Sequence, residues 1–194
     1  MDTEFHFEEI NGCTVLRLQS EDGTNRLMRN CVHRLSEELL QLSARTRCAP
    51  LVVAGNERFF SAGADLGEIS CLSGPAALEF SKIGQELMAA IDEFPAPTYA
   101  AIAGYCMGGG LDLALACRHR IASSHAVFGH RGAALGLITG WGGTQRLPRL
   151  IGKGRALEIF VAAEKLLAEH ALRIGLIDAI AENPIAEALK RATR

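Results

Sequence analysis

The stretch 97-PTYAAIAGYCMGGGLDLALACR-118 decides the fold, because a strand pattern, a glycine cluster and a helix pattern follow one another within it. Residues 99–103 are an apolar run that ends at Gly104, and glycines occupy 108–110. From Leu111 onward alanine and leucine dominate, which predicts a buried helix. Glycine lets a backbone approach another group closely, and the first amides of a helix have no partner within it. The stretch is therefore either a main-chain cradle for an anion or oxyanion, or a flexible turn between two core elements.

Short strands alternate with helices along the rest of the chain, which predicts one α/β domain spanning 1–194. Strands are expected at 4–9 and 13–19 around an Asn11-Gly12 turn, and at 50–54, 120–122, 126–128 and 176–180. Helices are expected at 27–43, 75–94, 155–167, 168–173 and 184–194, with another running from an N-cap at Thr144 through Leu150.

Composition excludes several classes of protein. A net charge of -2 and 6% aromatic residues argue against a nucleic-acid partner. No apolar run reaches the roughly 18 residues of a membrane span, and the acidic start MDTEFHFEEI has no signal-peptide pattern. The six cysteines are far apart without a CxxC pair, which favours reduced thiols and no metal site. We expect a cytoplasmic protein.

Other catalytic motifs fail on single residues. Gly110 stands where a phosphate-binding P-loop needs lysine, and Gln145 replaces the third glycine of a dinucleotide fingerprint. No G-x-S-x-G elbow is present. Cys106 is better interpreted as a small buried thiol than as a nucleophile. Asp65 and Glu68 have capping-box spacing, so Asp65 is interpreted as a helix N-cap.

Three segments in register carry a resemblance to a known family. They are 51-LVVAGNERFFSAGADLGE-68, the opening stretch, and 127-VFGHRGAALGLITGWGGTQRLPRLIGKGRALEI-159. Together they resemble the crotonase superfamily, the enoyl-CoA hydratase/isomerase family, over about 15–180. The resemblance implies a crotonase-like spiral of ββα units and an acyl-CoA substrate, with coenzyme A as part of the substrate and no separate cofactor. It also implies a homotrimer or hexamer.

The resemblance assigns roles to particular residues. The backbone N–H groups of Ala64 and Gly109 are expected to bind the thioester oxygen as an oxyanion hole, stabilising an enolate. Ala62 and Ala64 belong to the segment expected to bind the CoA moiety. Arg58 matches a basic position that contacts CoA phosphates. Gly67 stands where relatives carry a second basic residue, so weaker binding of CoA is expected.

The acid–base residues depart from the family pattern. Hydratases of the family carry two glutamates; here Asp112 occupies one position and Gly132 the other. Gly132 has no side chain to move a proton, which argues against a standard two-glutamate hydration. His130, two residues before Gly132, is a second candidate for proton transfer, although a loop histidine is more often an exposed, non-catalytic residue.

Three functions remain open. Asp112 or His130 handles the proton in a hydratase-like or isomerase-like reaction, making the chain a lyase or an isomerase. Alternatively, the oxyanion hole alone supports an acyl-CoA decarboxylase, for which His130-Arg131 and Trp141 are a faint signal. The third possible function is non-catalytic: the chain binds acyl-CoA or a partner subunit without turnover.

The length of the chain is a further departure from the family pattern. Relatives continue for several more helices, so we expect a C-terminal helical region that is short or missing. Helices at 155–173 and 184–194 are then expected to leave apolar surface for another subunit to cover.

Overall fold

The computed structural model describes residues 3–193 and begins with the predicted hairpin. Strand β1 (Glu4–Ile10) pairs antiparallel with β2 (Cys13–Gln19). The turn residues Asn11 and Gly12 both have positive φ, at 51° and 76°. Such values are the backbone requirement that makes Asn-Gly a hairpin signal.

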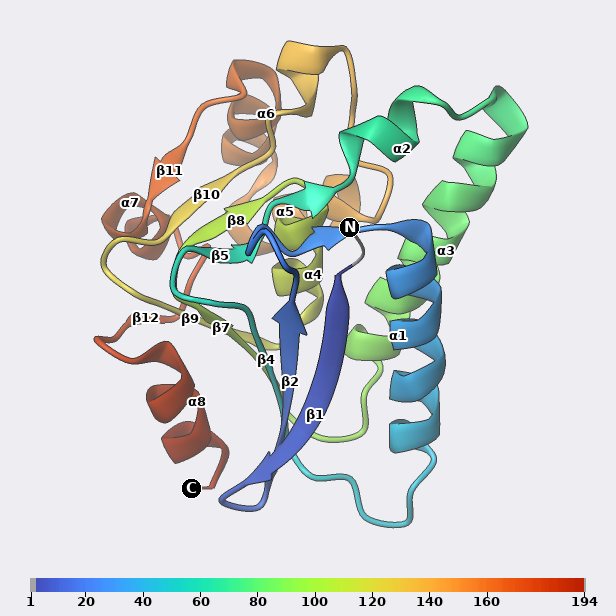
Figure 1. Cartoon of the computed structure of the whole chain (residues 1–194). Coiled ribbons are helices and arrows are strands. Elements are labelled where there is room, and N and C mark those ends of the chain that lie inside the picture. The colour runs from blue at the N-terminus through green and yellow to red at the C-terminus, as the bar shows by residue number, and fades with distance from the viewer. Residues whose placement is uncertain (1–2, 194) are drawn as a thin grey trace.

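Two sheets form the body of the molecule (Figure 1). The larger has the order β1-β2-β4-β7-β9-β12, and its further strands are β4 (Leu51–Ala54), β7 (Thr98–Ile102), β9 (His119–Ala122) and β12 (Ala179–Ile180). The smaller has the order β11-β10-β8-β5, made of β5 (Phe59–Ser61), β8 (Tyr105–Met107), β10 (Val127–Gly129) and β11 (Leu166–Leu167). In each of the pairs β4/β5, β7/β8 and β9/β10, the first strand lies in the larger sheet and the second in the smaller sheet. The pairs follow one another in the same order across both sheets, and this repetition is the predicted spiral. A short parallel ladder joins β3 (Arg26–Leu27) to β6 (Gly63–Ala64).

The helices are α1 (Arg29–Ser43), α2 (Leu66–Ser70), α3 (Gly74–Asp92), α4 (Gly109–Ala116), α5 (Gly143–Ile151), α6 (Lys153–Ala162), α7 (Ala168–Arg173) and α8 (Pro184–Ala192), with a 3-10 turn η1 (Gly132–Leu135). Figure 1 shows α1 and α3 packed side by side along one flank, and α4 in the centre. From Gly110 to Ala116 every residue of α4 is buried, as its apolar sequence predicts.

The central strands of the larger sheet are buried on both faces. Leu16, Val53 and Ala100 belong to the main core, while their neighbours Val52 and Tyr99 belong to a second cluster. The alternation follows from the two-residue period of a strand. Helix α8 covers the second cluster, to which Ala188 and Leu189 contribute. Because both faces are covered, β4 is apolar throughout, and so is β7 after its first residue, Thr98.

Four details of the predicted elements were wrong. The strand expected at 176–180 forms only as β12 (Ala179–Ile180), because residues 176–178 are bends after α7. The segment after Gly104 is not one glycine turn: the chain crosses to the smaller sheet and forms β8 before α4 begins. Thr144 is not the N-cap of α5, because Gly142, at φ 102°, precedes its first residue. The helix expected at 155–167 ends at Ala162, because Ala163 is left-handed at φ 53° and β11 follows.

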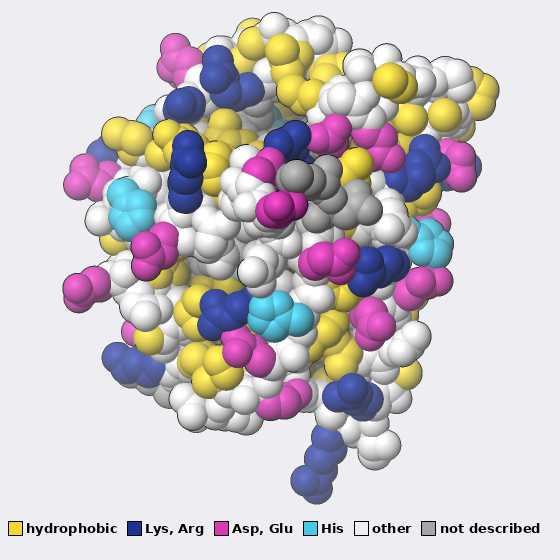
Figure 2. Space-filling model, viewed as in Figure 1, with side chains coloured by type: hydrophobic (Ala, Val, Ile, Leu, Met, Phe, Trp, Pro, Cys, Tyr) yellow, Lys and Arg dark blue, Asp and Glu magenta, His cyan; other side chains and the backbone are white. Residues whose placement is uncertain are grey.

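Most of the exposed large apolar residues lie in two places, with Leu40 on α1 apart from both. Leu157, Val161, Leu167 and Leu172 are exposed on the C-terminal third, as the sequence predicted for this region. Figure 2 shows a second group of apolar side chains along its upper edge, over η1 and the turn from α2 to α3. Exposed leucines and isoleucines here include Leu66, Leu78, Leu135 and Ile138.

Within residues 3–193 no helix is long and apolar enough to cross a membrane. The same part of the chain contains no cluster of three histidine, cysteine or acidic side chains that could hold a metal ion.

Candidate active site

A cavity of about 530 Å³ lies beneath the second apolar group. Five of the predicted site residues line it: Ala62, Ala64, Gly109, Asp112 and His130. Helices α2 and α3 contribute an apolar wall that includes Ile69 and Phe80, and the chain around η1 contributes Leu137 and Ile138. The cavity is therefore mostly apolar, with a few polar groups gathered at its inner end.

Two glycine turns meet at that inner end. Gly63 has φ 92° and Gly108 has φ 51°, which are conformations that glycine adopts at little cost. A Cβ atom at Gly63 would lie 2.9 Å from the amide nitrogen of Gly109. A Cβ atom at Gly109 would lie 3.3 Å from the amide nitrogen of Ala64. The backbone segments carrying the two predicted donor amides are thus in direct contact, and Gly109 is the first residue of α4.

Asp112 and His130 form a buried pair beside these turns. Asp112 lies in the first turn of α4 and His130 directly follows β10; their exposed fractions are 1% and 4%. Asp112 Oδ1 lies 3.1 Å from His130 Nε2, which is an ion-pair distance without the alignment of a hydrogen bond. Neither atom has a hydrogen-bond partner among the described residues. The sequence favoured an exposed loop for His130, and this was wrong because the chain after β10 turns into the cavity.

Two residues that the sequence analysis did not single out complete this pair. The Thr139 hydroxyl donates to Asp112 Oδ2. Gly143 provides the space in which the pair meets, since a Cβ atom there would lie 2.1 Å from Asp112 Oδ1 and 3.0 Å from His130 Nε2. The run of glycines at 140, 142 and 143 was the available signal, because clustered glycines mark a close approach of backbone to other groups.

Trp141 holds two parts of the site together. Its ring packs directly against Gly84 and Gly109. A Cβ atom added at Gly84 would lie 2.1 Å from the nearest ring atom, and one added at Gly109 would lie 2.4 Å from the nearest ring atom. Its indole N–H donates to the carbonyl oxygen of Phe80 at 3.2 Å. The ring therefore joins α3 to the start of α4, next to the amide of Gly109.

The remaining candidates lie elsewhere or have structural roles. Arg58 is exposed, its guanidinium 5.5 Å from the Phe59 ring centre, and it does not line the cavity. Asp65 is the N-cap of α2, as predicted, and accepts from the Glu68 amide at 2.9 Å. Burial raises the pKa of the Cys106 thiol well above its usual range, which agrees with a buried thiol and not a nucleophile.

Gly132 lies in η1 and lines the cavity without contributing a functional group. Its neighbour Arg131 is exposed and also lines it. Among the described residues of the lining, the ionisable side chains are therefore Asp112, His130 and Arg131.

Comparison with known proteins places this chain in a family. The family described as enoyl-CoA hydratase/isomerase matches residues 8–194. A probable enoyl-CoA hydratase of Bacillus subtilis is 40% identical over 169 residues, covering 87% of this chain and 65% of that protein. Crotonyl-CoA hydratase of Syntrophomonas wolfei is 34% identical, covering 90% of this chain and 68% of that one. The chain thus spans about two thirds of the length of these relatives.

Solved structures agree with the sequence comparison. Pseudomonas aeruginosa DspI matches with a TM-score of 0.93 and 35% identity, over 99% of this chain and 80% of that chain. The enoyl-CoA hydratase of Bacillus anthracis matches with a TM-score of 0.91 and 30% identity, over 100% of this chain and 76% of that one. The chain has the crotonase fold and belongs to the enoyl-CoA hydratase/isomerase family of the crotonase superfamily.

Proposed function

We propose that this chain is an acyl-CoA enzyme that stabilises a thioester enolate with the backbone amides of Ala64 and Gly109. The observation that carries the proposal is the contact between the two glycine turns at the inner end of the cavity. Two amides directed at one oxygen stabilise the negative charge that forms when a proton leaves the carbon next to the thioester. Loss of one such donor typically costs about 10²–10³ in rate.

The Asp112–His130 pair is the proposed acid–base group. In its neutral form His130 takes the proton from substrate carbon; the C–H electron pair moves to the thioester oxygen, and the imidazolium faces the Asp112 carboxylate. The hydrogen bond from Thr139 fixes the orientation of that carboxylate. Returning the proton to another carbon gives an isomerase reaction, and adding water across an enoyl bond gives a lyase reaction. With Gly132 in place of a second carboxylate, one acid–base group serves both half-reactions.

The CoA moiety is proposed to leave the cavity past Ala62 and to meet Arg58 at the surface. Arg58 is exposed and makes no ion pair among the described residues, so its guanidinium is available for phosphate. Arg–phosphate contacts at the surface weaken with salt. The salt dependence of acyl-CoA binding in the wild type and in Arg58→Gln tests this assignment.

A decarboxylase is a second candidate because the exposed Arg131 lines the cavity. Its positive charge is suited to the carboxylate of a malonyl-type thioester. Loss of CO₂ from such a substrate would produce the same enolate without a base. Binding of acyl-CoA without turnover is the non-catalytic alternative.

One experiment separates these functions. The protein is incubated in D₂O with butyryl-, crotonyl- and malonyl-CoA, and α-deuteration, water addition and CO₂ release are followed by mass spectrometry. The proposal predicts deuteration or hydration that falls about 10²–10⁴-fold in His130→Gln, the range for loss of a general acid or base. His125→Gln, an exposed histidine outside the cavity, is the matched control. CO₂ release alone favours the decarboxylase, tight binding without chemistry favours the non-catalytic function, and no binding refutes all three.

A homotrimer or hexamer is proposed from the family resemblance and from the exposed apolar residues of the C-terminal third. Leu157, Val161 and Leu167 are each more than half exposed, which is unfavourable unless another surface covers them. Light scattering at micromolar concentration is expected to give a multiple of 20.8 kDa. A clean monomer would contradict the proposed assembly.

A further inference from the structure

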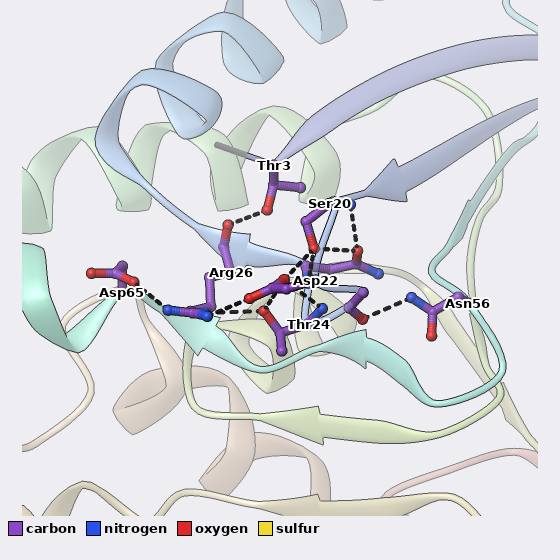
Figure 3. A network of polar contacts seen from close by, with 9 residues as sticks. Thr3, Ser20, Asp22, Thr24, Arg26, Asn56 and Asp65 are labelled. Carbon is purple, nitrogen blue, oxygen red and sulfur yellow. Dashed lines mark hydrogen bonds and ion pairs between the residues drawn. The ribbon is translucent and has the colours of Figure 1, made fainter. Parts of the chain in front are cut away.

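The segment that carries the Ala64 amide is held by a polar network outside the cavity (Figure 3). The network begins in the turn between β2 and β3. Asn25, fully buried with φ 51°, donates from its side chain to the carbonyl oxygens of Phe59 at 3.0 Å and Phe60 at 3.3 Å. Its Oδ1 accepts from the backbone amide of Ser20 at 3.1 Å. The turn is therefore attached to β5, the strand that leads toward Ala64.

Ser61 extends the network to the residue before Ala64. Its buried hydroxyl donates to the backbone oxygen of Asn25 at 2.7 Å and accepts from the amide of Gly63 at 3.0 Å. The ladder between β3 and β6 then places Arg26 beside Gly63 and Leu27 beside Ala64. These contacts fix the chain on the N-terminal side of the proposed donor.

Arg26 reaches to the other side of Ala64. Its Nη1 donates to Asp65 Oδ2 at 3.1 Å, its Nη2 pairs with Asp22, and its Nε donates to Thr24 Oγ1 at 3.0 Å. Figure 3 shows the guanidinium between the two carboxylates. The Glu68 amide and, with a smaller effect, Arg26 hold the pKa of Asp65 below its usual range, so Asp65 is ionised at neutral pH. One side chain thus ties the β2–β3 turn to the residue that follows Ala64.

Helix α2 has few other means of keeping its position. It has five residues, none of them fully buried, and its apolar contact with the main core is made by the partly buried Ile69. The remaining polar contacts of α2 with the rest of the chain are made by Glu68, which accepts a hydrogen bond from the Arg29 amide at 2.9 Å. The orientation of the Gly63–Ala64 peptide, which carries the Ala64 N–H, therefore depends on polar contacts on both sides of it, among which Arg26 is the most exposed.

We propose that Arg26 is a positioning residue for the Ala64 amide. This inference rests on the proposed function, since it assumes that the Ala64 amide binds the thioester oxygen. Arg26 does not line the cavity, so its effect is exerted through Asp65 and the β3–β6 ladder. Without the guanidinium, the turn at Ala64 is freer to rotate, and its hydrogen bond to the thioester oxygen weakens while the apolar contacts with the acyl group remain.

The test uses 4-dimethylaminocinnamoyl-CoA, an enoyl thioester whose absorption band moves to longer wavelength when its carbonyl oxygen accepts hydrogen bonds. Spectra are recorded at saturating protein for the wild type, Arg26→Gln and Arg26→Lys. Arg34→Gln is the matched control, because Arg34 makes a comparably exposed ion pair with Glu4 at 3.2 Å, away from the cavity. Urea midpoints of all variants exclude global unfolding as the cause.

We expect a red shift on binding to the wild type and to Arg34→Gln, and a smaller one in Arg26→Gln. Lysine is a point charge without the planar fork, so it cannot bridge Asp22 and Asp65 in the same way, and Arg26→Lys should give an intermediate shift. In the deuteration assay kcat should fall about threefold to tenfold in Arg26→Gln with little change in KM, a part of the loss expected for a missing donor.

The two possible failures are distinguishable. A wild-type protein that binds the probe without any red shift would refute the proposed oxyanion hole itself. A wild-type shift that Arg26→Gln and Arg26→Lys retain in full would leave the oxyanion hole standing and refute the role of Arg26.

Discussion

Substitution of Gly143 by alanine tests the Asp112–His130 pair most directly. The added Cβ atom would lie 2.1 Å from Asp112 Oδ1, which is 1.3 Å short of the 3.4 Å at which ordinary contact begins. It would also lie 2.9 Å from Thr139 Cγ2 and 3.0 Å from His130 Nε2. Asp112 is 1% exposed and lines the cavity, so its carboxylate can escape the added Cβ only by turning into the cavity, away from His130 and Thr139.

Two effects determine how much Gly143→Ala lowers the free energy of unfolding. Overpacking of a well-packed site costs about 1–3 kcal/mol. Separating a buried carboxylate from its partner adds to this, since breaking a buried pair costs about 3–5 kcal/mol when one partner is removed completely. We therefore expect Gly143→Ala to lower the free energy of unfolding by about 2–4 kcal/mol. Where folded protein remains, α-deuteration should fall by at least about tenfold, because proton transfer depends on geometry.

Urea unfolding followed by circular dichroism measures the first effect, and mass spectrometry in D₂O measures the second. Gly154→Ala is the matched control, because Gly154 is an exposed position in α6 with nothing within 4 Å of an added Cβ. Alanine is the better helix former by roughly 0.5–1 kcal/mol, so this control should be neutral or stabilising. A Gly143→Ala protein as stable and as active as Gly154→Ala would show that Gly143 does not lie against the Asp112–His130 pair.

Three further substitutions test other parts of the structure. Gly132→Glu should raise water addition to a short enoyl-CoA, by at most the about 10²–10⁴ of a positioned acid or base, relative to Gly132→Ala; the alanine control brings the same Cβ contact with the Leu137 carbonyl oxygen at 2.8 Å. Gly84→Ala should destabilise the fold by about 1–3 kcal/mol in urea, since its Cβ would lie 2.1 Å from Trp141; an unchanged midpoint would contradict the packing of that ring. Burial lowers the pKa of His119, so the unfolded chain binds more protons and stability should fall as pH drops below about 6.5. His119→Gln should make urea midpoints at pH 7.5 and 5.5 more alike, and an unaltered difference would assign the pH dependence elsewhere.

The fold was largely predictable from local patterns. The Asn11-Gly12 turn, the apolar runs of β4 and β7 and the Asp65 cap each follow from a few adjacent residues, and each is confirmed. The strand β8 was not predicted, because three residues next to a glycine cluster carry no periodicity of their own. Its pairing partners, β5 and β10, come from parts of the chain more than 20 residues away in sequence on either side.

The candidate site was predictable in its backbone and less so in its side chains. The glycines beside Ala64 and Gly109 predict a close approach of backbone segments, while the roles of these two residues as amide donors came from the family resemblance. The partner of Asp112 could not be identified in the same way, since whether His130 faces solvent or the cavity depends on how the chain leaves β10. Thr139 lies 27 residues from Asp112 in sequence and meets it only because α5 folds back over α4.

The charge of the site distinguishes this chain from a two-carboxylate arrangement. In a two-glutamate arrangement one carboxylate acts as the base and becomes neutral when it takes the proton, while the other acts as a protonated acid, so neither places a positive charge beside the enolate. In the proposed mechanism a single carboxylate faces an imidazole, so proton uptake by His130 creates a positive charge beside Asp112. That charge stabilises the enolate as well as pairing with Asp112, and the low exposure of both residues keeps water from screening it. Removing the carboxylate alone should therefore harm the reaction more than removing an equivalent charge at the cavity mouth, because it leaves the imidazolium buried without a counter-charge.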